Sequence, residues 1–220
     1  MGYCEDIAGK VIGGKAKEVV ALVEQALAEG ENPEDLLTKG LMAGMNVIGE
    51  KFKLNEVFVP EVLVAARAMN KGMQVLKPAL AKAGAEPLGK AVICTVKGDM
   101  HDIGKNLVKM MIEGRGIECI DLGTDVDAER VVEAVKENGA QIVCLSALLT
   151  TTMNAQKDVI DALVAAGIRD KVRVMVGGAP VTQEFANEIG ADYYTLDAAS
   201  AAEVAEKALK EMNGKSSAPY

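Results

Sequence analysis

The feature that most constrains the fold is a repeated alternation, after residue 90, of short apolar runs with amphipathic segments. Short apolar runs separated by helical periodicity are typical of a parallel sheet covered by helices on both faces. Five such units favour a flavodoxin-like α/β fold with strand order 2-1-3-4-5. Strands are predicted at 90–96, 116–121, 141–146, 172–176 and 192–195, and helices at 103–114, 127–138, 152–166, 181–189 and 199–211.

The first 83 residues predict helices only. Apolar residues recur there at helical spacing, and Asn32 followed by Pro33 is a typical helix start, with an N-cap and a proline at the first helical position. Helices are predicted at 15–28, from Pro33 towards Phe52, and from about Val59 to Leu80, with a kink or fraying at Pro78. Helices that fill roughly 80 residues in this way predict a small bundle, of four helices.

The chain is expected to form two domains. Residues 82–89 are rich in Gly, Ala and Pro and lack periodicity, which is typical of a linker. We therefore expect a helical domain at 1–83, a linker at 84–89 and an α/β domain at 90–212. The final residues, 213–220, are small and polar and predict a disordered tail.

Composition excludes several classes of protein. A net charge of −8 disfavours a nucleic-acid partner, because phosphate binding needs a basic face. No apolar run is long enough to span a bilayer, and the first residues lack the build of a secretory signal, so we expect a cytoplasmic protein with no membrane partner. The four cysteines lack the spacing of a metal site and favour buried reduced thiols over a thiolate metal ligand; they are Cys4, Cys94, Cys119 and Cys144.

The single histidine of the chain, His101, follows the first predicted strand. Open α/β sheets bind ligands at the carboxyl ends of their strands, which is where this loop lies. Asp99 can accept a hydrogen bond from one ring nitrogen and leave the other for a metal or a proton. The alternative is a loop histidine exposed by chance beside a carboxylate that caps the next helix.

Two further motifs follow strands of the same sheet. Ser146 ends the third predicted strand, and Gly177 and Gly178 end the fourth. In the order 2-1-3-4-5 the first strand lies beside the third and the third beside the fourth, so one crevice gathers all three loops. Each motif also has an ordinary interpretation as a strand end, a tight turn or, for residues 150–152, a helix cap.

The complete pattern resembles a known family. Asp99-x-His101-x-x-Gly104, Ser146-x-Leu148 and Gly177-Gly178 are similar, in this order, to the signatures of cobalamin-binding domains. They resemble the corrinoid module of cobalamin-dependent methionine synthase and the corrinoid proteins of methanol, methylamine and methoxyarene methyltransferase systems. The resemblance covers the chain from about residue 15 to about residue 209.

The resemblance implies a "base-off, His-on" cobalamin site. His101 would bind the cobalt, Asp99 would accept the other ring N–H, and Thr152 would stand where methionine synthase has a serine that completes the relay. A helical cap would cover the other face of the corrin with Phe52 and Val59, which composition alone would place in the bundle core. The other residues that the resemblance assigns to the cofactor are Gly98, Met100, Asp102, Ile103, Gly104, Ser146, Leu148, Thr150, Gly177, Gly178 and Ala198.

The function implied by the resemblance is that of a methyl carrier without a complete active site of its own. It would take a methyl group on cobalamin, as methylcobalamin, from a donor-specific methyltransferase. An acceptor methyltransferase would then pass the methyl group to tetrahydrofolate or coenzyme M. A reductive activation protein would be a further partner. The alternative is a cobalamin-binding sensor or regulatory module. A response-regulator-like domain is disfavoured because the acidic cluster expected after its first strand is absent.

Overall fold

A computed structural model describes residues 2–84 and 87–214. The chain divides into two compact units, one made of Met1–Pro87 and Gly114–Gly116 and the other of Leu88–Glu113 and Ile117–Tyr220. Residues 85 and 86 of the expected linker and 215–220 of the expected tail lie outside the described residues. Asn213, which was expected in a disordered tail, instead ends the last helix, and its side chain donates to the carbonyl of Leu88 at 3.0 Å.

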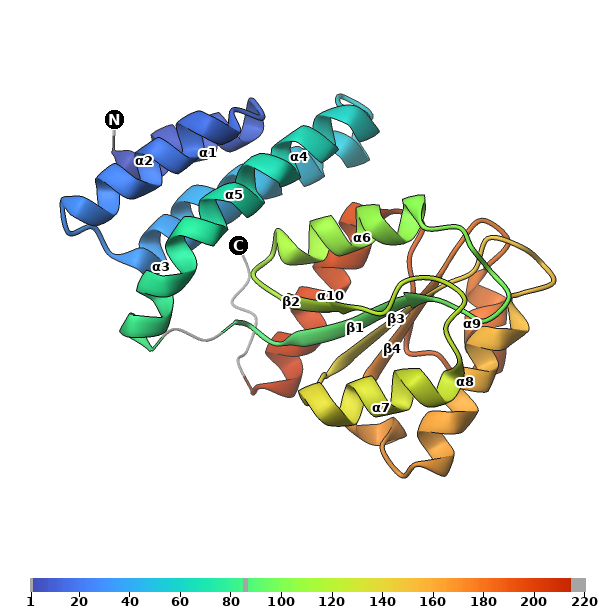
Figure 1. Cartoon of the computed structure of the whole chain (residues 1–220). Coiled ribbons are helices and arrows are strands. Elements are labelled where there is room, and N and C mark those ends of the chain that lie inside the picture. Colours follow the sequence, from blue (N-terminus) through green and yellow to red (C-terminus); the bar gives the residue numbers. More distant parts are fainter. Residues whose placement is uncertain (1, 85–86, 215–220) are drawn as a thin grey trace. The chain divides into compact units, whose positions relative to one another are not determined.

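The first unit is helical, as the sequence predicts. Its helices are α1 (Tyr3–Ile12), α2 (Ala16–Ala28), α3 (Pro33–Asp35), the π-helical segment η1 (Leu36–Met42), α4 (Ala43–Lys53) and α5 (Val59–Ala83). The last of these is continuous through Pro78. Asn32 is confirmed as an N-cap, because its side chain accepts a hydrogen bond from the backbone N–H of Glu34 at 2.8 Å. Because α3, η1 and α4 follow one another without a break, they form one continuous helix. Together with α1, α2 and α5, the described part of this unit therefore has the predicted four helices (Figure 1).

The second unit is a parallel sheet in the predicted order β2-β1-β3-β4-β5. Its strands are β1 (Lys90–Thr95), β2 (Glu118–Asp121), β3 (Ile142–Ser146), β4 (Arg173–Gly177) and β5 (Tyr193–Tyr194). The three central strands, β1, β3 and β4, are almost wholly buried, which explains why they are apolar at nearly every position. The flavodoxin-like α/β fold is therefore confirmed.

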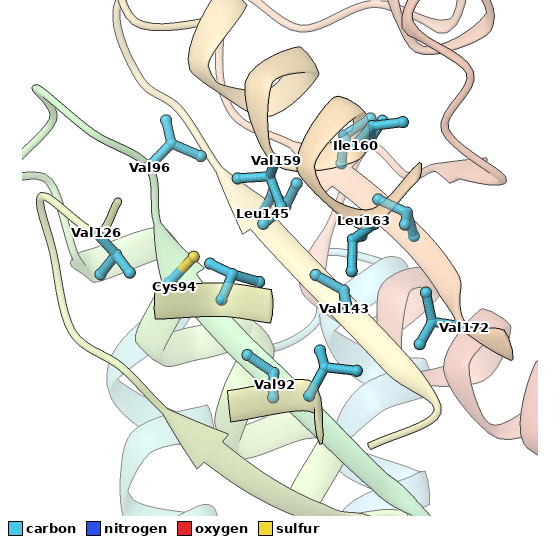
Figure 2. Close-up of a cluster of buried hydrophobic side chains, with 14 of the residues drawn as sticks. Val92, Cys94, Val96, Val126, Val143, Leu145, Val159, Ile160, Leu163 and Val172 are labelled. Carbon is cyan, nitrogen blue, oxygen red and sulfur yellow. The ribbon is translucent and has the colours of Figure 1, made fainter. Parts of the chain in front are cut away.

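Helices cover both faces of the sheet (Figure 1). They are α6 (Ile103–Glu113), α7 (Ala128–Asn138), α8 (Asn154–Ala165), α9 (Gln183–Ile189) and α10 (Ala198–Met212). Helices α6 and α10 pack against each other, and α7 and α9 both pack against α8. On the α7–α9 side, Val92 and Cys94 of β1 and Leu145 of β3 pack against Leu163 of α8 in one apolar cluster (Figure 2).

The register of the sheet aligns the ends of the three central strands. Thr95 of β1 pairs with Ser146 of β3, and Ser146 pairs with Gly177 of β4. Two backbone hydrogen bonds continue beyond the strands: Val96 donates to Ser146 at 3.0 Å, and Ala147 donates to Gly177 at 3.1 Å. The three loops that carry the sequence motifs therefore leave the sheet side by side.

Candidate functional site

The histidine loop, residues 96–102, connects β1 to α6 at the carboxyl edge of the sheet. Asp99 is fully buried, whereas the side chain of His101 is half exposed. The Nδ1 atom of His101 lies 2.6 Å from Oδ1 of Asp99, and the same oxygen accepts from the His101 backbone N–H at 3.0 Å. Because an ionised carboxylate can only accept, Nδ1 carries a proton, and Nε2 is the ring nitrogen left for another partner.

The second oxygen of Asp99 is held by the loop after β3. Its Oδ2 accepts from the backbone N–H of Leu148 at 2.7 Å and from that of Leu149 at 3.3 Å. It also lies 2.7 Å from Oγ1 of Thr152, which is itself buried. The first and second sequence motifs are thus joined through one carboxylate, and the structure brings the three predicted relay residues, His101, Asp99 and Thr152, into hydrogen-bond contact.

The carboxyl of Asp99 is ionised although it is buried. Burial alone would raise its pKa, but hydrogen bonds from the Thr152 hydroxyl, from the backbone and ring of His101 and from the Leu148 backbone outweigh burial and hold the pKa well below its ordinary value. A carboxylate in this state orients the ring and increases the basicity of Nε2 as a ligand. The arrangement presents one neutral imidazole nitrogen to whatever occupies the edge of the sheet.

The surface around His101 is apolar and open. The side chains of Met100 and Ile103 are 70% and 78% exposed, and that of Leu148 is 41% exposed. A Cβ added to Gly104 would have no neighbour within 4 Å, so nothing in this chain requires a glycine there. Large exposed apolar side chains that gather around a potential ligand atom indicate a surface covered by a ligand or a partner.

The glycines of the third motif have an explanation within the fold. A Cβ on Gly178 would lie 1.7 Å from the carbonyl oxygen of Ala147, and its φ of +129° is one that side chains rarely adopt. The sequence interpretation, in which these glycines make room for a cofactor, is therefore not needed for Gly178. Gly177 is less constrained, since its Cβ would only reach 4.0 Å from the oxygen of Thr195.

The remaining predicted residues are placed as follows. Thr150 is exposed in the loop before α8, and Ala198 is buried at the start of α10, directly after its N-cap Asp197. Gly98 and Asp102 are exposed in the histidine loop. Phe52 and Val59 belong to the helical unit, where both are half-buried, so neither is a fully buried core residue.

Several polar residues that support the loop escaped the sequence analysis. The hydroxyl of the buried Thr95 donates to the His101 carbonyl at 2.8 Å. The ammonium of Lys105, almost fully buried in the first turn of α6, lies 2.6 Å from Asp121 at the end of β2. The sequence alone does not mark them, because the burial of both side chains and the partner of Lys105 depend on how the elements pack.

The expectation of buried reduced thiols is confirmed for two of the four cysteines, whereas Cys4 and Cys119 are free but only partly buried. Cys94 and Cys144 are buried and free, and burial raises the pKa of both to about 12. Among the described residues, no three His, Cys, Asp or Glu side chains are grouped as metal ligands. Within the same residues, no helix combines the length and the apolar character that crossing a membrane requires.

Comparison with known proteins decides the family. A B12 binding domain model matches residues 89–205, and a second model of the same description matches residues 3–77. The chain belongs to the family of B12-binding corrinoid proteins. It is 43% identical to dimethylamine corrinoid protein 3 of Methanosarcina acetivorans, over 94% of this chain and 97% of that protein. Trimethylamine corrinoid protein 1 of the same organism is 49% identical over 79% of this chain and 81% of its own length.

A solved structure extends the comparison to the fold. The chain matches the crystal structure of the methanol:cobalamin methyltransferase complex MtaBC from Methanosarcina barkeri with a TM-score of 0.83 and 35% identity. The match covers 92% of this chain and 78% of the chain in that structure. The family of corrinoid proteins that the three motifs predict is therefore confirmed.

The residues present fit a corrinoid. His101 offers a single nitrogen, which suits a metal that brings its other ligands with it, as the cobalt of a corrin does. Met100, Ile103 and Leu148 offer an apolar surface to a large flat ring, and Gly104 leaves the start of α6 without a Cβ. These features are of the protein alone and support the cofactor that the family implies.

Proposed function

We propose that this corrinoid protein is a methyl carrier in which His101 replaces the cofactor's own base as the axial ligand of cobalt. The observation that carries the proposal is the contact of 2.6 Å between Nδ1 of His101 and the buried Asp99, which leaves Nε2 available on a half-exposed ring. When bound, the corrinoid supplies the carbon chemistry by holding a methyl group on its cobalt.

The protein's part is to fix the ligand and adjust its basicity. Asp99 keeps the Nδ1–H tautomer of His101, and Thr152 stabilises the ionised form of Asp99 by donating its one hydroxyl proton at 2.7 Å. The Thr152 oxygen also lies 3.0 Å from the carbonyl of Leu149, so the two acceptors compete for that proton. When the hydroxyl turns from Asp99 to Leu149, the Asp99 carboxylate keeps its charge but loses one hydrogen bond, so it becomes a stronger acceptor for the Nδ1–H of His101. This is how we expect the relay to tune the bond to cobalt.

The proposed partners are two methyltransferases and a reductive activation protein. The relatives named after dimethylamine and trimethylamine support a methylated amine as the donor. The donor would bind to the first methyltransferase, and tetrahydrofolate or coenzyme M would receive the methyl group on the second. We also propose that Phe52 and Val59, both half-buried, contact the cofactor.

Axial ligation is testable directly because the chain has one histidine. The protein is reconstituted with hydroxocobalamin, reduced to the Co(II) state and prepared with natural-abundance or ¹⁵N-labelled histidine. EPR should show axial nitrogen hyperfine coupling that changes with the label. Coupling that is insensitive to the label would contradict ligation by His101.

Methyl transfer needs a separate test with partners. Mono-, di- and trimethylamine and methanol are offered with the corresponding methyltransferases, and methylation of the bound corrinoid is followed by its absorption spectrum. We expect methylation with one of the amines. A cofactor that binds through His101 but is methylated by none of the partners would favour the sensor alternative.

A further inference from the structure

The loop between β2 and α7, residues 122–127, supports the histidine loop from the side opposite to Thr152. None of the three sequence motifs lies in this loop, because they follow β1, β3 and β4. Strand β2 is the other neighbour of β1, and its loop leaves the same edge of the sheet. Backbone hydrogen bonds join this loop to the end of β1: Thr95 donates to Gly123 at 2.9 Å, and Val126 donates to Thr95 at 3.2 Å.

Asp125 bonds to the backbone of the histidine loop at two residues. Its Oδ1 accepts from the backbone N–H of Gly98 at 2.8 Å, and its own N–H donates to the carbonyl of Asp99 at 2.9 Å. One residue thus holds the N–H of Gly98 and the carbonyl of Asp99, at the start of the Asp99-x-His101 motif. The side chain of Asp99 is held by the loop after β3, so its backbone and its carboxylate are fixed from two different strands.

The backbone of Asp125 is in a conformation that few residues adopt. Its φ is +54°, and among the described non-glycine residues only Asn55 shares a positive φ. Asp and Asn tolerate this region better than other side chains, at a cost that the surrounding structure must offset. In this conformation both the side-chain oxygen and the backbone N–H of Asp125 face the histidine loop. They bond there to two consecutive residues, Gly98 and Asp99.

Charge does not explain the residue. Lys97 lies 3.1 Å from Asp127 but 4.0 Å from Asp125, and all three side chains are about half exposed, so these ion pairs contribute little. Asp127 shares the lysine with Asp125, but within the described part of the chain its carboxylate bonds to the Lys97 ammonium and to no backbone group of the histidine loop. It therefore provides a control residue of the same type two positions away.

We propose that Asp125 is a positioning residue for the axial ligand. By holding Gly98 and Asp99 it keeps the loop in the one shape that places the Asp99 carboxylate against Nδ1 of His101, so that Nε2 is presented before any cofactor binds. The proposal rests on the proposed function, because positioning matters only if His101 binds cobalt. It assigns a part of ligand binding to β2, which carries none of the three motifs.

Substitutions separate the hydrogen bond from the backbone conformation. Asp125→Gly adopts a positive φ freely and removes only the acceptor for Gly98, whereas Asp125→Asn keeps both the acceptor and the tolerance of that φ. Asp127→Gly and Asp127→Asn are the matched controls. Asp125→Ala removes the acceptor in a second way, should the glycine variant fold poorly.

The first measurement needs no cofactor. Protein labelled with ¹⁵N-histidine gives the NMR signals of one imidazole, and long-range ¹H–¹⁵N spectra report its tautomer. We expect the wild type, Asp125→Asn and both Asp127 variants to show the Nδ1–H form. Asp125→Gly and Asp125→Ala should show a mixture of tautomers and faster exchange of the Gly98 amide.

The second measurement uses the loaded protein. Affinity for hydroxocobalamin should fall on the order of 10-fold in Asp125→Gly, with a weaker ¹⁵N coupling in the Co(II) EPR spectrum. If the wild type lacks that coupling, the proposed function fails and this inference falls with it. If the wild type shows the coupling and a folded Asp125→Gly or Asp125→Ala matches it in tautomer, affinity and coupling, Asp125 only closes a turn and the inference is wrong.

Discussion

The loop after β1 and the loop after β4 carry equally recognisable motifs, but the fold explains them to different degrees. Gly178 is required by its approach to the Ala147 backbone and by its positive φ. In the histidine loop, by contrast, a fully buried carboxylate holds a half-exposed ring, and no packing requirement accounts for Gly104 beside it. A motif glycine is evidence for a ligand only where neither packing nor backbone conformation within the protein requires a glycine.

The largest effect on stability is expected at Gly178, the glycine that the fold requires. Gly178→Ala should lower the free energy of unfolding of the cofactor-free protein by more than ~4 kcal/mol, because a Cβ there overlaps a backbone oxygen that cannot move away. Chemical denaturation measures the change. Near wild-type stability with a selective loss of corrinoid affinity would reverse our interpretation of this glycine.

Asp99→Asn should be the next most disruptive. The amide cannot accept all the N–H and O–H groups that converge on the carboxylate, so we expect a loss of roughly 3 kcal/mol in the free energy of unfolding and a weaker bond between His101 and cobalt.

The same carboxylate predicts a dependence of stability on pH, because the folded-state pKa of Asp99 lies below its ordinary 3.8. The carboxylate therefore stabilises the fold above about pH 4 and loses this effect as the pH falls through the folded-state value. Denaturation from pH 7 to pH 3 should show the difference between wild type and variant shrinking; a constant difference would contradict it.

Thr152 offers a smaller and more selective change. Thr152→Val removes the hydroxyl from Asp99 while keeping the shape of the side chain, and should cost about 1–2 kcal/mol in stability. It should also shift the Co(II)/Co(I) midpoint potential, measured by spectroelectrochemistry. Thr152→Ser keeps the hydroxyl and is the control; a shift as large in the serine variant would remove the hydroxyl from the relay.

The smallest change in stability is expected at Gly104. Gly104→Ala meets no atom within 4 Å and lies in the first turn of α6, so the cofactor-free protein should gain up to about 1 kcal/mol. Corrinoid affinity should fall, because the new methyl group stands on the surface that we assign to the ring. Equal affinity in titrations of both proteins would place the ring elsewhere.

The sequence predicted most of the fold because its signals are strong and local. Apolar runs buried on both faces marked β1, β3 and β4, and the Asn-Pro pair at 32–33 marked a helix start that the structure confirms. Strand β5 is only two residues long, and its prediction as 192–195 was the least accurate in proportion. A strand this short is defined by its partner β4 and not by a pattern of its own.

The candidate site was predictable only as far as its motifs are continuous in sequence. Asp99 and His101 are two residues apart, and their contact follows from the loop alone. The contact between Leu148 and Asp99 depends on strand order, and that between Asp125 and Gly98 depends also on a positive φ that no apolar pattern encodes. Lys105 and Asp121 were missed for the same reason, because their pairing is set by how α6 packs on β2.

The row formed by Thr95, Ser146 and Gly177 restricts how such a chain can change in length during evolution. A deletion of one residue inside β3 or β4 would turn the following motif to the opposite face of the sheet and destroy the site in a single step. Insertions at the amino edge, where α7 and α8 return to the next strand, leave the row untouched. We therefore expect natural length variation, and tolerance of an engineered insertion, to concentrate at turns such as 166–171, far along the sheet from the histidine.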